Sequence, residues 1–214
     1  MNRNAKTPGE SSKAQTDTGS ERMQNDPIKQ FRDWYDLAGK WAEPEPDAMA
    51  LATADEEGRP SVRMVLFKDI SRDGLCFFTN LGSRKALQLQ KNPFAALLFY
   101  WPELFRQVRI EGKVRKVSSK ISDDYFNSRP LGSRISACIS PQSAVIPDRL
   151  FLEAMHDSFS RDLGRKAPQR PVNWGGYILV PDRFEFWTGR ENRLHDRIQY
   201  RKARSGWIIE RLAP

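Results

Sequence analysis

Short apolar runs separated by turn residues dominate the middle of the chain and return near its C-terminus. Runs of this kind, bounded by Gly, Pro, Asn and Asp, are typical of β-strands. They predict strands over residues 48–54, 62–68, 75–80, 94–100 and 107–117, and over 176–180, 183–187, 197–201 and 207–211. Only short turns at 55–60 and 71–74 join the first three runs, so the pattern indicates a meander of antiparallel strands.

Helical patterns interrupt these strands in isolated places. They predict helices over residues 83–91, 118–127 and 148–163, preceded by a first helix over 28–39. Asp26 can cap this first helix and Pro27 can occupy its first position, while Phe31 and Trp34 give it an aromatic packing surface. Because the chain lacks the strand–helix–strand rhythm of a parallel sheet, the order of elements predicts an α+β domain built on a β-barrel.

The N-terminal segment has a different composition. Residues 1–26 contain no aromatic residue and are rich in Ser, Thr, Gly, Asn and charge. Such a segment cannot bury enough apolar area to offset the entropy lost on ordering. We therefore expect a disordered tail over residues 1–25 and a single domain over 26–214.

The charge balance narrows the class of partner. The 35 Lys and Arg residues against 27 Asp and Glu residues leave a formal net charge of +8, which suits nucleic acid, a membrane surface or phosphorylated small molecules. The basic residues are scattered through apolar, strand-like segments, which favours discrete phosphate pockets over a continuous nucleic-acid-binding stripe. We expect neither a nucleic-acid nor a membrane partner.

Cysteine, histidine and apolar content disfavour several other classes. The two cysteines, Cys76 and Cys138, form no cluster with His156 or His195, so a zinc or haem site has little support. The longest apolar run, over 94–101, is far shorter than the roughly 18 residues that suggest a membrane helix. The first residues lack the apolar centre of a signal peptide. We expect a cytoplasmic protein.

Ser83, Arg84 and Lys85 form a candidate phosphate site. A helix that begins at Ser83 places both cations in its first turn, where the helix dipole already concentrates positive charge. An anion bound there would turn this repulsion into attraction. A solvated helix start explains the same residues equally well.

Two further groups of residues can each be interpreted either as an anion-binding site or as ordinary surface or packing residues. In an extended backbone, Arg193, His195 and Arg197 project from one face and form an anion-binding row, although rows of this kind are common on solvated strands. Tyr125 and Arg129 are one helical turn apart, and Pro130 can end the helix so that Ser133 returns toward them. These hydroxyls and the guanidinium form a phosphate cradle, or else the tyrosine merely packs on the arginine stem.

Together, the separated motifs resemble one family. In chain order they are Arg63 to Lys68, Phe78 to Asn80, Ser83 to Lys85, Arg106 to Arg109, Tyr125 to Pro130 with Ser133, Gln142 with Ser143, Glu185 to Trp187 and Asn192 to Arg197. Their order and approximate spacing are similar to those of the pyridoxamine 5'-phosphate oxidases. The similarity runs from about Asp26 to Pro214.

The resemblance implies an FMN-binding split β-barrel with peripheral helices, assembled as a homodimer whose flavin sites lie at the interface. The residues implied to contact FMN are Arg63, Met64, Val65, Leu66, Phe67, Lys68, Phe78, Thr79, Arg84, Lys85, Gln107, Gln142, Ser143, Trp187 and Arg197. The residues implied to hold the substrate 5'-phosphate are Lys68, Tyr125, Arg129 and Ser133. Arg193 and His195 are implied to lie against the substrate ring, which makes them the candidate catalytic residues.

The implied activity is synthesis of pyridoxal 5'-phosphate by oxidation of pyridoxamine 5'-phosphate or pyridoxine 5'-phosphate, with O2 as acceptor and H2O2 as product. Because a flavin performs the hard chemistry, no strong nucleophile is required of the protein. Family members often carry Arg-x-x-Tyr in an N-terminal lid. None precedes Asp26 here, and Arg32 and Tyr35 fall in the predicted helix, so no lid residue is assigned. The alternatives are a related split-barrel flavoenzyme with another substrate and a non-catalytic flavin or pyridoxal phosphate carrier.

Overall fold

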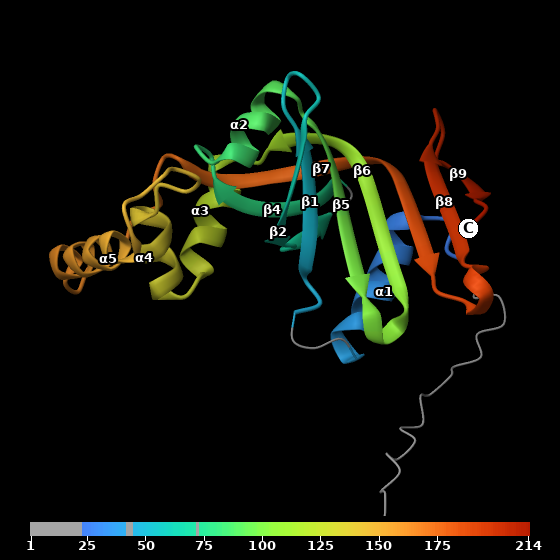
Figure 1. Cartoon of the computed structure of the whole chain (residues 1–214), viewed down its shortest axis with the longest axis horizontal. Helices are drawn as coiled ribbons and strands as arrows, with labels where there is room; N and C mark the ends of the chain where they lie inside the picture. The colour runs from blue at the N-terminus through green and yellow to red at the C-terminus, as the bar shows by residue number, and fades with distance from the viewer. Residues whose placement is uncertain (1–22, 42–44, 72) are drawn as a thin grey trace, which may run out of the picture.

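The computed structural model describes residues 23–41, 45–71 and 73–214. Its fold is built on one antiparallel sheet (Figure 1). Its strands are β1 (Ala48–Ala54), β2 (Pro60–Leu66), β3 (Asp69–Ser71), β4 (Gly74–Asn80), β5 (Phe94–Trp101), β6 (Arg106–Lys116), β7 (Trp174–Thr188), β8 (Asp196–Lys202) and β9 (Trp207–Arg211). The order is β2-β1-β5-β6-β7-β4-β3, with β8 paired to β7 and β9 paired to β8. The sheet curls so that β2 approaches β4 without pairing to it, which leaves the barrel split at that seam.

The long strand β7 organises the sheet. It pairs with β6 along most of its length, with β4 through its first half and with β8 through its second half. The prediction of two separate strands over 176–180 and 183–187 is therefore wrong. The β6–β7 register shifts between Glu111, which lies opposite Arg183, and Gly112, which lies opposite Pro181, so β7 passes Asp182 through a bulge without ending.

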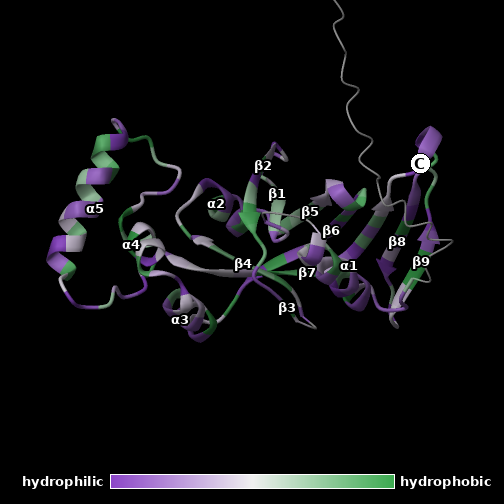
Figure 2. Cartoon of the chain, turned by 90° about the horizontal axis from the view of Figure 1, so that it is seen from below, coloured by the Kyte–Doolittle hydropathy of each residue, from purple (hydrophilic) through white to green (hydrophobic). Residues whose placement is uncertain are grey.

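The helices surround the barrel. They are α1 (Pro27–Trp41), α2 (Arg84–Lys91), α3 (Ser119–Ser128), α4 (Leu131–Ile139) and α5 (Arg149–Leu163), with short 3-10 turns η1 (Pro102–Leu104) and η2 (Glu191–Arg193). Figures 1 and 2 show α3, α4 and α5 at one end of the molecule and β8 and β9 at the other. The pattern did not predict α4 or β3, and the expected turn over 71–74 begins inside β3.

Helix α1 closes one side of the core as its sequence predicted. The Asp26 side chain accepts a hydrogen bond from the Ile28 N–H at 2.9 Å, so this carboxylate caps the helix as expected. Phe31 is fully buried and packs edge-on against Phe67 and Phe99, with ring centroids 5.6 and 4.9 Å away. Aromatic pairs of this geometry stabilise a core beyond their area burial.

The described chain begins three residues before Asp26. Met23 packs against the core, and the Gln24 carbonyl accepts a hydrogen bond of 2.7 Å from the Tyr200 hydroxyl. Residues 1–22 of the predicted tail lie outside the described residues, so the tail and its boundary stay predictions.

The predicted α+β architecture, a curled antiparallel sheet with peripheral helices, is confirmed. Among the described residues, no helix has the length and apolar character that a membrane crossing requires.

Candidate active site

A cleft of about 830 Å³ lies where β2, β4, α2, α3 and α4 meet. Five cations line it, namely Arg63, Lys68, Arg84, Lys85 and Arg129, and no carboxylate of the described residues does. We call it the cationic cleft. It also contains Met64, Val65, Leu66, Phe78, Thr79, Tyr125, Ser133, Gln142 and Ser143 from the predicted site, and Trp174, Ser136 and Ser140, which sequence reasoning missed.

Lys85 is a buried cation in the lining of the cleft. Its side chain is only 9% exposed, and its Nζ lies 3.1 Å from Thr79 Oγ1, 3.0 Å from Gln142 Oε1 and 3.3 Å from Ser83 Oγ. These partners are all neutral. Burial, assisted by the nearby charge of Arg63, lowers the pKa of Lys85 to about 8. A buried ammonium without a counter-charge is the kind of group that a phosphate stabilises.

Arg63 is held in place by the barrel wall. Its Nη1 donates to the Leu51 carbonyl at 3.0 Å and to Thr53 Oγ1 at 2.7 Å, and Thr53 in turn donates to Gln88 Oε1 at 2.6 Å. Burial, followed by the charge of Arg84, lowers the pKa of Arg63. Thr53 and Gln88 are buried polar residues that sequence reasoning missed; a polar residue within the apolar run of β1 was the available signal.

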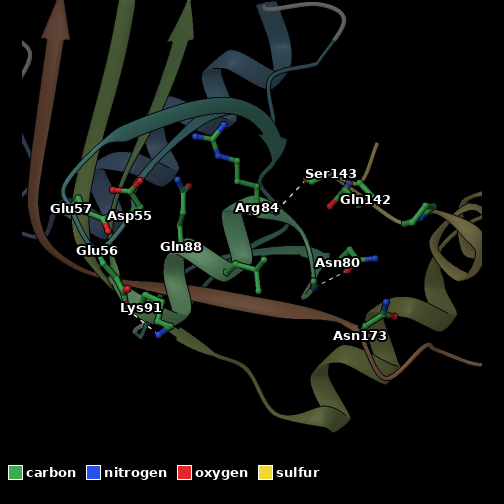
Figure 3. A pocket seen from close by; sticks show the side chains of 14 residues that line it. Asp55, Glu56, Glu57, Asn80, Arg84, Gln88, Lys91, Gln142, Ser143 and Asn173 are labelled. Carbon is green, nitrogen blue, oxygen red and sulfur yellow. Dashed lines mark hydrogen bonds and ion pairs between the residues drawn. The ribbon is translucent and has the colours of Figure 1, made fainter. Parts of the chain in front are cut away.

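The first turn of α2 lines the cationic cleft. The predicted placement of Arg84 and Lys85 in its first turn is confirmed, and this turn contains no acidic residue. The Arg84 N–H donates to Ser143 Oγ at 3.2 Å, a contact drawn in Figure 3. Arg84 also lines a neighbouring pocket of about 700 Å³ that includes Asp55 and Glu56 (Figure 3), so it lines both cavities.

Arg129 and Tyr125 are fixed at the other part of the cleft by aromatic stacking. Tyr125 stacks on Phe78 with centroids 4.0 Å apart, and the Arg129 guanidinium lies 4.9 Å from the centre of the Trp174 ring. Pro130 ends α3 at Ser128, as predicted, but Arg129 is the extended residue after the helix and does not share a helical face with Tyr125. Its Nη1 is buried without a hydrogen-bond partner, and burial lowers the pKa of Arg129.

Ser133 reaches the cleft from α4, and Lys68 reaches it from beyond the end of β2. Arg63 and Lys68 would lie on opposite faces of a continuous strand. The strand ends at Leu66, which allows both side chains to line one cavity. The Lys68 Nζ forms an ion pair of 2.7 Å with Asp47. Phe67, by contrast, is 6% exposed and packs in the core, so its predicted contact with a cofactor finds no side-chain support.

The remaining predicted residues gather elsewhere on the sheet. We call Gln107, Trp187, Arg193, His195 and Arg197 the C-terminal cluster. In the ladders, Trp187 lies opposite Gln107 on β6 and opposite Arg197 on β8, and the His195 ring lies 4.7 Å from it. None of these side chains lines the cationic cleft.

A buried carboxylate organises the C-terminal cluster. Glu185 is 3% exposed and accepts hydrogen bonds from Arg197 Nε at 2.8 Å and from Arg109 Nη2 at 2.6 Å. The hydrogen bond that Arg197 donates to the Glu185 carboxylate raises the pKa of Arg197. Glu185 was noticed in the sequence only as part of a motif, because nothing in a linear pattern shows which charges a buried carboxylate meets.

The predicted extended row of Arg193, His195 and Arg197 is wrong. Only Arg197 belongs to a strand, whereas Arg193 ends the turn η2 with a φ of 61° and follows Asn192 with a φ of 54°. His195 Nδ1 accepts a hydrogen bond of 3.1 Å from the Arg190 N–H. The left-handed turn replaces the even alternation of a strand, so the three side chains do not project side by side.

Family models match most of the described chain. Residues 38–159 match the family model described as pyridoxamine 5'-phosphate oxidase, and residues 174–214 match the pyridoxine 5'-phosphate oxidase C-terminal dimerisation region. The chain is 50% identical over 194 residues to a pyridoxine/pyridoxamine 5'-phosphate oxidase of Legionella pneumophila (strain Paris), covering 91% of this chain and 90% of that protein. It is 53% identical over 189 residues to that of Ralstonia pickettii (strain 12J), covering 88% and 89%.

A solved structure is also similar. It is PhzG from Burkholderia lata 383 in complex with tetrahydrophenazine-1-carboxylic acid, with a TM-score of 0.83 and 32% identity, covering 89% of this chain and 94% of that one. The similarity extends over both the barrel and the peripheral helices, and the dimerisation region supports the predicted homodimer.

Proposed function

Because the chain belongs to the pyridoxamine 5'-phosphate oxidase family, we propose that it oxidises pyridoxamine 5'-phosphate and pyridoxine 5'-phosphate to pyridoxal 5'-phosphate. The reaction uses FMN, O2 and, for the amine, water that hydrolyses the imine; it releases H2O2 and, from the amine, NH3. The observation that carries the proposal is the cationic cleft, where five cations and no lining carboxylate can hold two phosphate groups, one from the cofactor and one from the substrate.

The FMN phosphate fits the part of the cleft around Lys85. Lys85, Arg63 and Arg84 supply positive charge, the N-terminus of α2 supplies backbone N–H groups, and Gln142 and Ser143 supply polar partners. The buried Lys85 ammonium has only neutral hydrogen-bond partners and lies near the positive charge of Arg63, which is the imbalance that a phosphate dianion corrects. When bound, the flavin supplies the two-electron oxidation, taking a hydride equivalent from C4' of the vitamer and passing the electrons to O2.

The substrate phosphate fits the part of the cleft around Arg129. The Nη1 of Arg129 has no hydrogen-bond partner among the described residues, and Tyr125, Ser133 and Lys68 line the same cleft. Fixed anchoring of the phosphate places the opposite end of a small substrate at a reproducible distance from the cofactor, which lowers the entropic cost of reaction.

The substrate ring is positioned by the C-terminal cluster. Because the cluster does not line the cleft of its own chain, we propose that the second copy in the homodimer supplies it, with Gln107, Trp187 and Arg197 toward FMN. Arg193 and His195 then lie against the ring, where a planar guanidinium can stack and hold C4' near the flavin. The match of residues 174–214 to a dimerisation region supports this arrangement, since four of the five cluster residues lie within it.

A second candidate function is oxidation of another ring substrate by a related flavoenzyme. The similarity to PhzG, whose structure contains tetrahydrophenazine-1-carboxylic acid, favours it. The Arg129 guanidinium, whose Nη1 has no hydrogen-bond partner among the described residues, lies in the cleft with two hydroxyls and Lys68. This arrangement suits a phosphate better, and we therefore rank the oxidation of another ring substrate second. The cytoplasmic location expected from the sequence stays a prediction.

An oxygen-consumption assay tests the proposed function. FMN-loaded protein is mixed with each phosphorylated vitamer, with each unphosphorylated vitamer and with tetrahydrophenazine-1-carboxylic acid. We expect peroxide and pyridoxal 5'-phosphate from the two phosphorylated vitamers and much slower turnover of the others. Turnover confined to the phenazine compound would favour the second function, and a flavin spectrum without any turnover would favour a carrier.

A further inference from the structure

One of the five cations of the cleft differs from the other four. Lys68 forms an ion pair with Asp47, with Nζ and Oδ2 2.7 Å apart, and the two side chains are 23% and 24% exposed. The other four, Arg63, Arg84, Lys85 and Arg129, form no ion pair with any described residue. The positive charge of the cleft is therefore partly neutralised at one point only.

The fold fixes Asp47 at this point. Asp47 directly precedes β1, and its carbonyl accepts a hydrogen bond of 2.8 Å from the Phe67 N–H, which continues the β1–β2 ladder by one residue. The Lys68 N–H in turn donates to the Cys76 carbonyl of β4 at 3.0 Å. Both backbones are anchored, so the ion pair forms without ordering a loop.

We propose that Asp47 is a specificity-determining residue of the substrate phosphate site, because its carboxylate competes with the phosphate for the Lys68 ammonium and so weakens the binding of phosphorylated ligands. The inference rests on the proposed function, which assigns Lys68 to the substrate phosphate. Substrate and product carry the same phosphate. The competition therefore weakens the binding of substrate and product alike, and the return of Lys68 to Asp47 helps a phosphorylated product to leave.

The competition follows from the positions of the charges. A phosphate that takes the Lys68 Nζ must share it with Asp47 or displace Asp47 from it, and in either case the Lys68–Asp47 ion pair is weakened. Asp47 does not line the cleft, so it touches neither substrate nor cofactor and acts only through Lys68. The charge of Asp47 also reaches Tyr35, whose pKa is raised by burial and then by that charge.

Binding without turnover tests the inference. FMN-loaded protein is titrated by calorimetry with 4-deoxypyridoxine 5'-phosphate, which has no oxidisable heteroatom at C4', and with unphosphorylated 4-deoxypyridoxine. We expect Asp47→Asn to tighten the phosphorylated ligand about two- to fivefold, the range for a partly exposed ion pair. It should leave the unphosphorylated ligand and the flavin content unchanged.

Three variants serve as controls. Asp73→Asn removes the same charge from an exposed pair with Arg115, outside both cavities, and should have no effect. Asp47→Glu keeps the charge and should bind like the parent protein. In a Lys68→Met background, Asp47→Asn should no longer tighten binding, because the cation for which the two anions compete is absent.

The outcomes separate this inference from the proposed function. Weaker or unchanged binding by Asp47→Asn, in protein with full flavin content, overturns the inference even if the enzyme turns over phosphorylated vitamers. The predicted order of affinities in a protein that consumes no O2 supports the inference and overturns the function. No measurable binding by the parent protein overturns both.

Discussion

Replacing Arg129 with alanine separates substrate binding from cofactor binding. The side chain is positioned by the Trp174 ring, 4.9 Å from its Cζ, and its Nη1 is buried without a partner among the described residues. Lys85, assigned to the FMN phosphate, is held by a different set of neighbours, including Thr79 and Gln142. The substitution should therefore affect one phosphate and not the other.

The magnitude follows from the bonds that are lost. Charge-assisted hydrogen bonds from Arg129 to a phosphate contribute about 1.5–3 kcal/mol, so kcat/KM for pyridoxamine 5'-phosphate should fall about ten- to a hundredfold. The free energy of unfolding should change little. Loss of the contact with Trp174 costs about 0.5–1 kcal/mol, while removal of a guanidinium whose pKa is lowered by burial relieves a desolvation cost.

Steady-state kinetics on pyridoxamine 5'-phosphate and on unphosphorylated pyridoxamine measure the effect. Residual activity on pyridoxamine should hardly change, because this substrate has no phosphate to lose. Arg149→Ala is the matched control, since it removes an 88% exposed arginine side chain from α5 and should leave both substrates unaffected. An Arg129→Ala protein with full flavin content and unchanged kcat/KM for the phosphorylated substrate would refute the assignment.

Three further predictions concern the ring, the cofactor and the tail. Arg193→Ala should impair turnover of both the phosphorylated and the unphosphorylated substrate, because it acts on ring orientation; the same kinetics check this. Because the pKa of Lys85 is lowered from 10.5 to about 8, FMN affinity, measured by flavin fluorescence, should fall as pH rises through about 8 and should lose this dependence in Lys85→Met. In the unfolded chain Lys85 keeps its ammonium proton up to about pH 10.5. The free energy of unfolding of flavin-free protein, measured by denaturant titration, should therefore rise between pH 8 and 10.5. Deleting residues 1–22 should leave the melting temperature within a few degrees, whereas deletion through Gln24 also removes its bond with Tyr200 and should lower it.

Local signals in the sequence were enough for most of the fold. Strands β1 and β9 begin and end at the predicted residues, because an apolar run and the turns beside it are both local properties. The end of α3 two residues before Pro130 was predictable for the same reason, since proline acts within a few residues. The start of α2 was also predicted at Ser83, although the Ser83 side chain makes no capping hydrogen bond.

What escaped prediction depends on contacts between distant segments or on weak local preference. Helix α4 contains Gly132 and Ser133, poor helix formers, in a segment that packs against α5 in the structure. The turn at Arg193 requires a positive φ at this residue, which an arginine in the sequence does not predict. Likewise, the pairing of Lys68 with Asp47 joins residues 21 positions apart and depends on the β1–β2 register.

The division of the site between two regions of one chain has a thermodynamic consequence. In the proposed function the cationic cleft holds the two phosphate groups, whereas the flavin and substrate rings are contacted by the C-terminal cluster, which lies on β6 to β8 outside the lining of the cleft. With the cluster supplied by a second copy, each bound flavin contacts two chains. Any ligand that binds only the assembled state stabilises that state by mass action. Flavin binding and dimer stability are then linked in this protein, and a substitution in the cluster should weaken both, whereas Arg129→Ala should weaken neither.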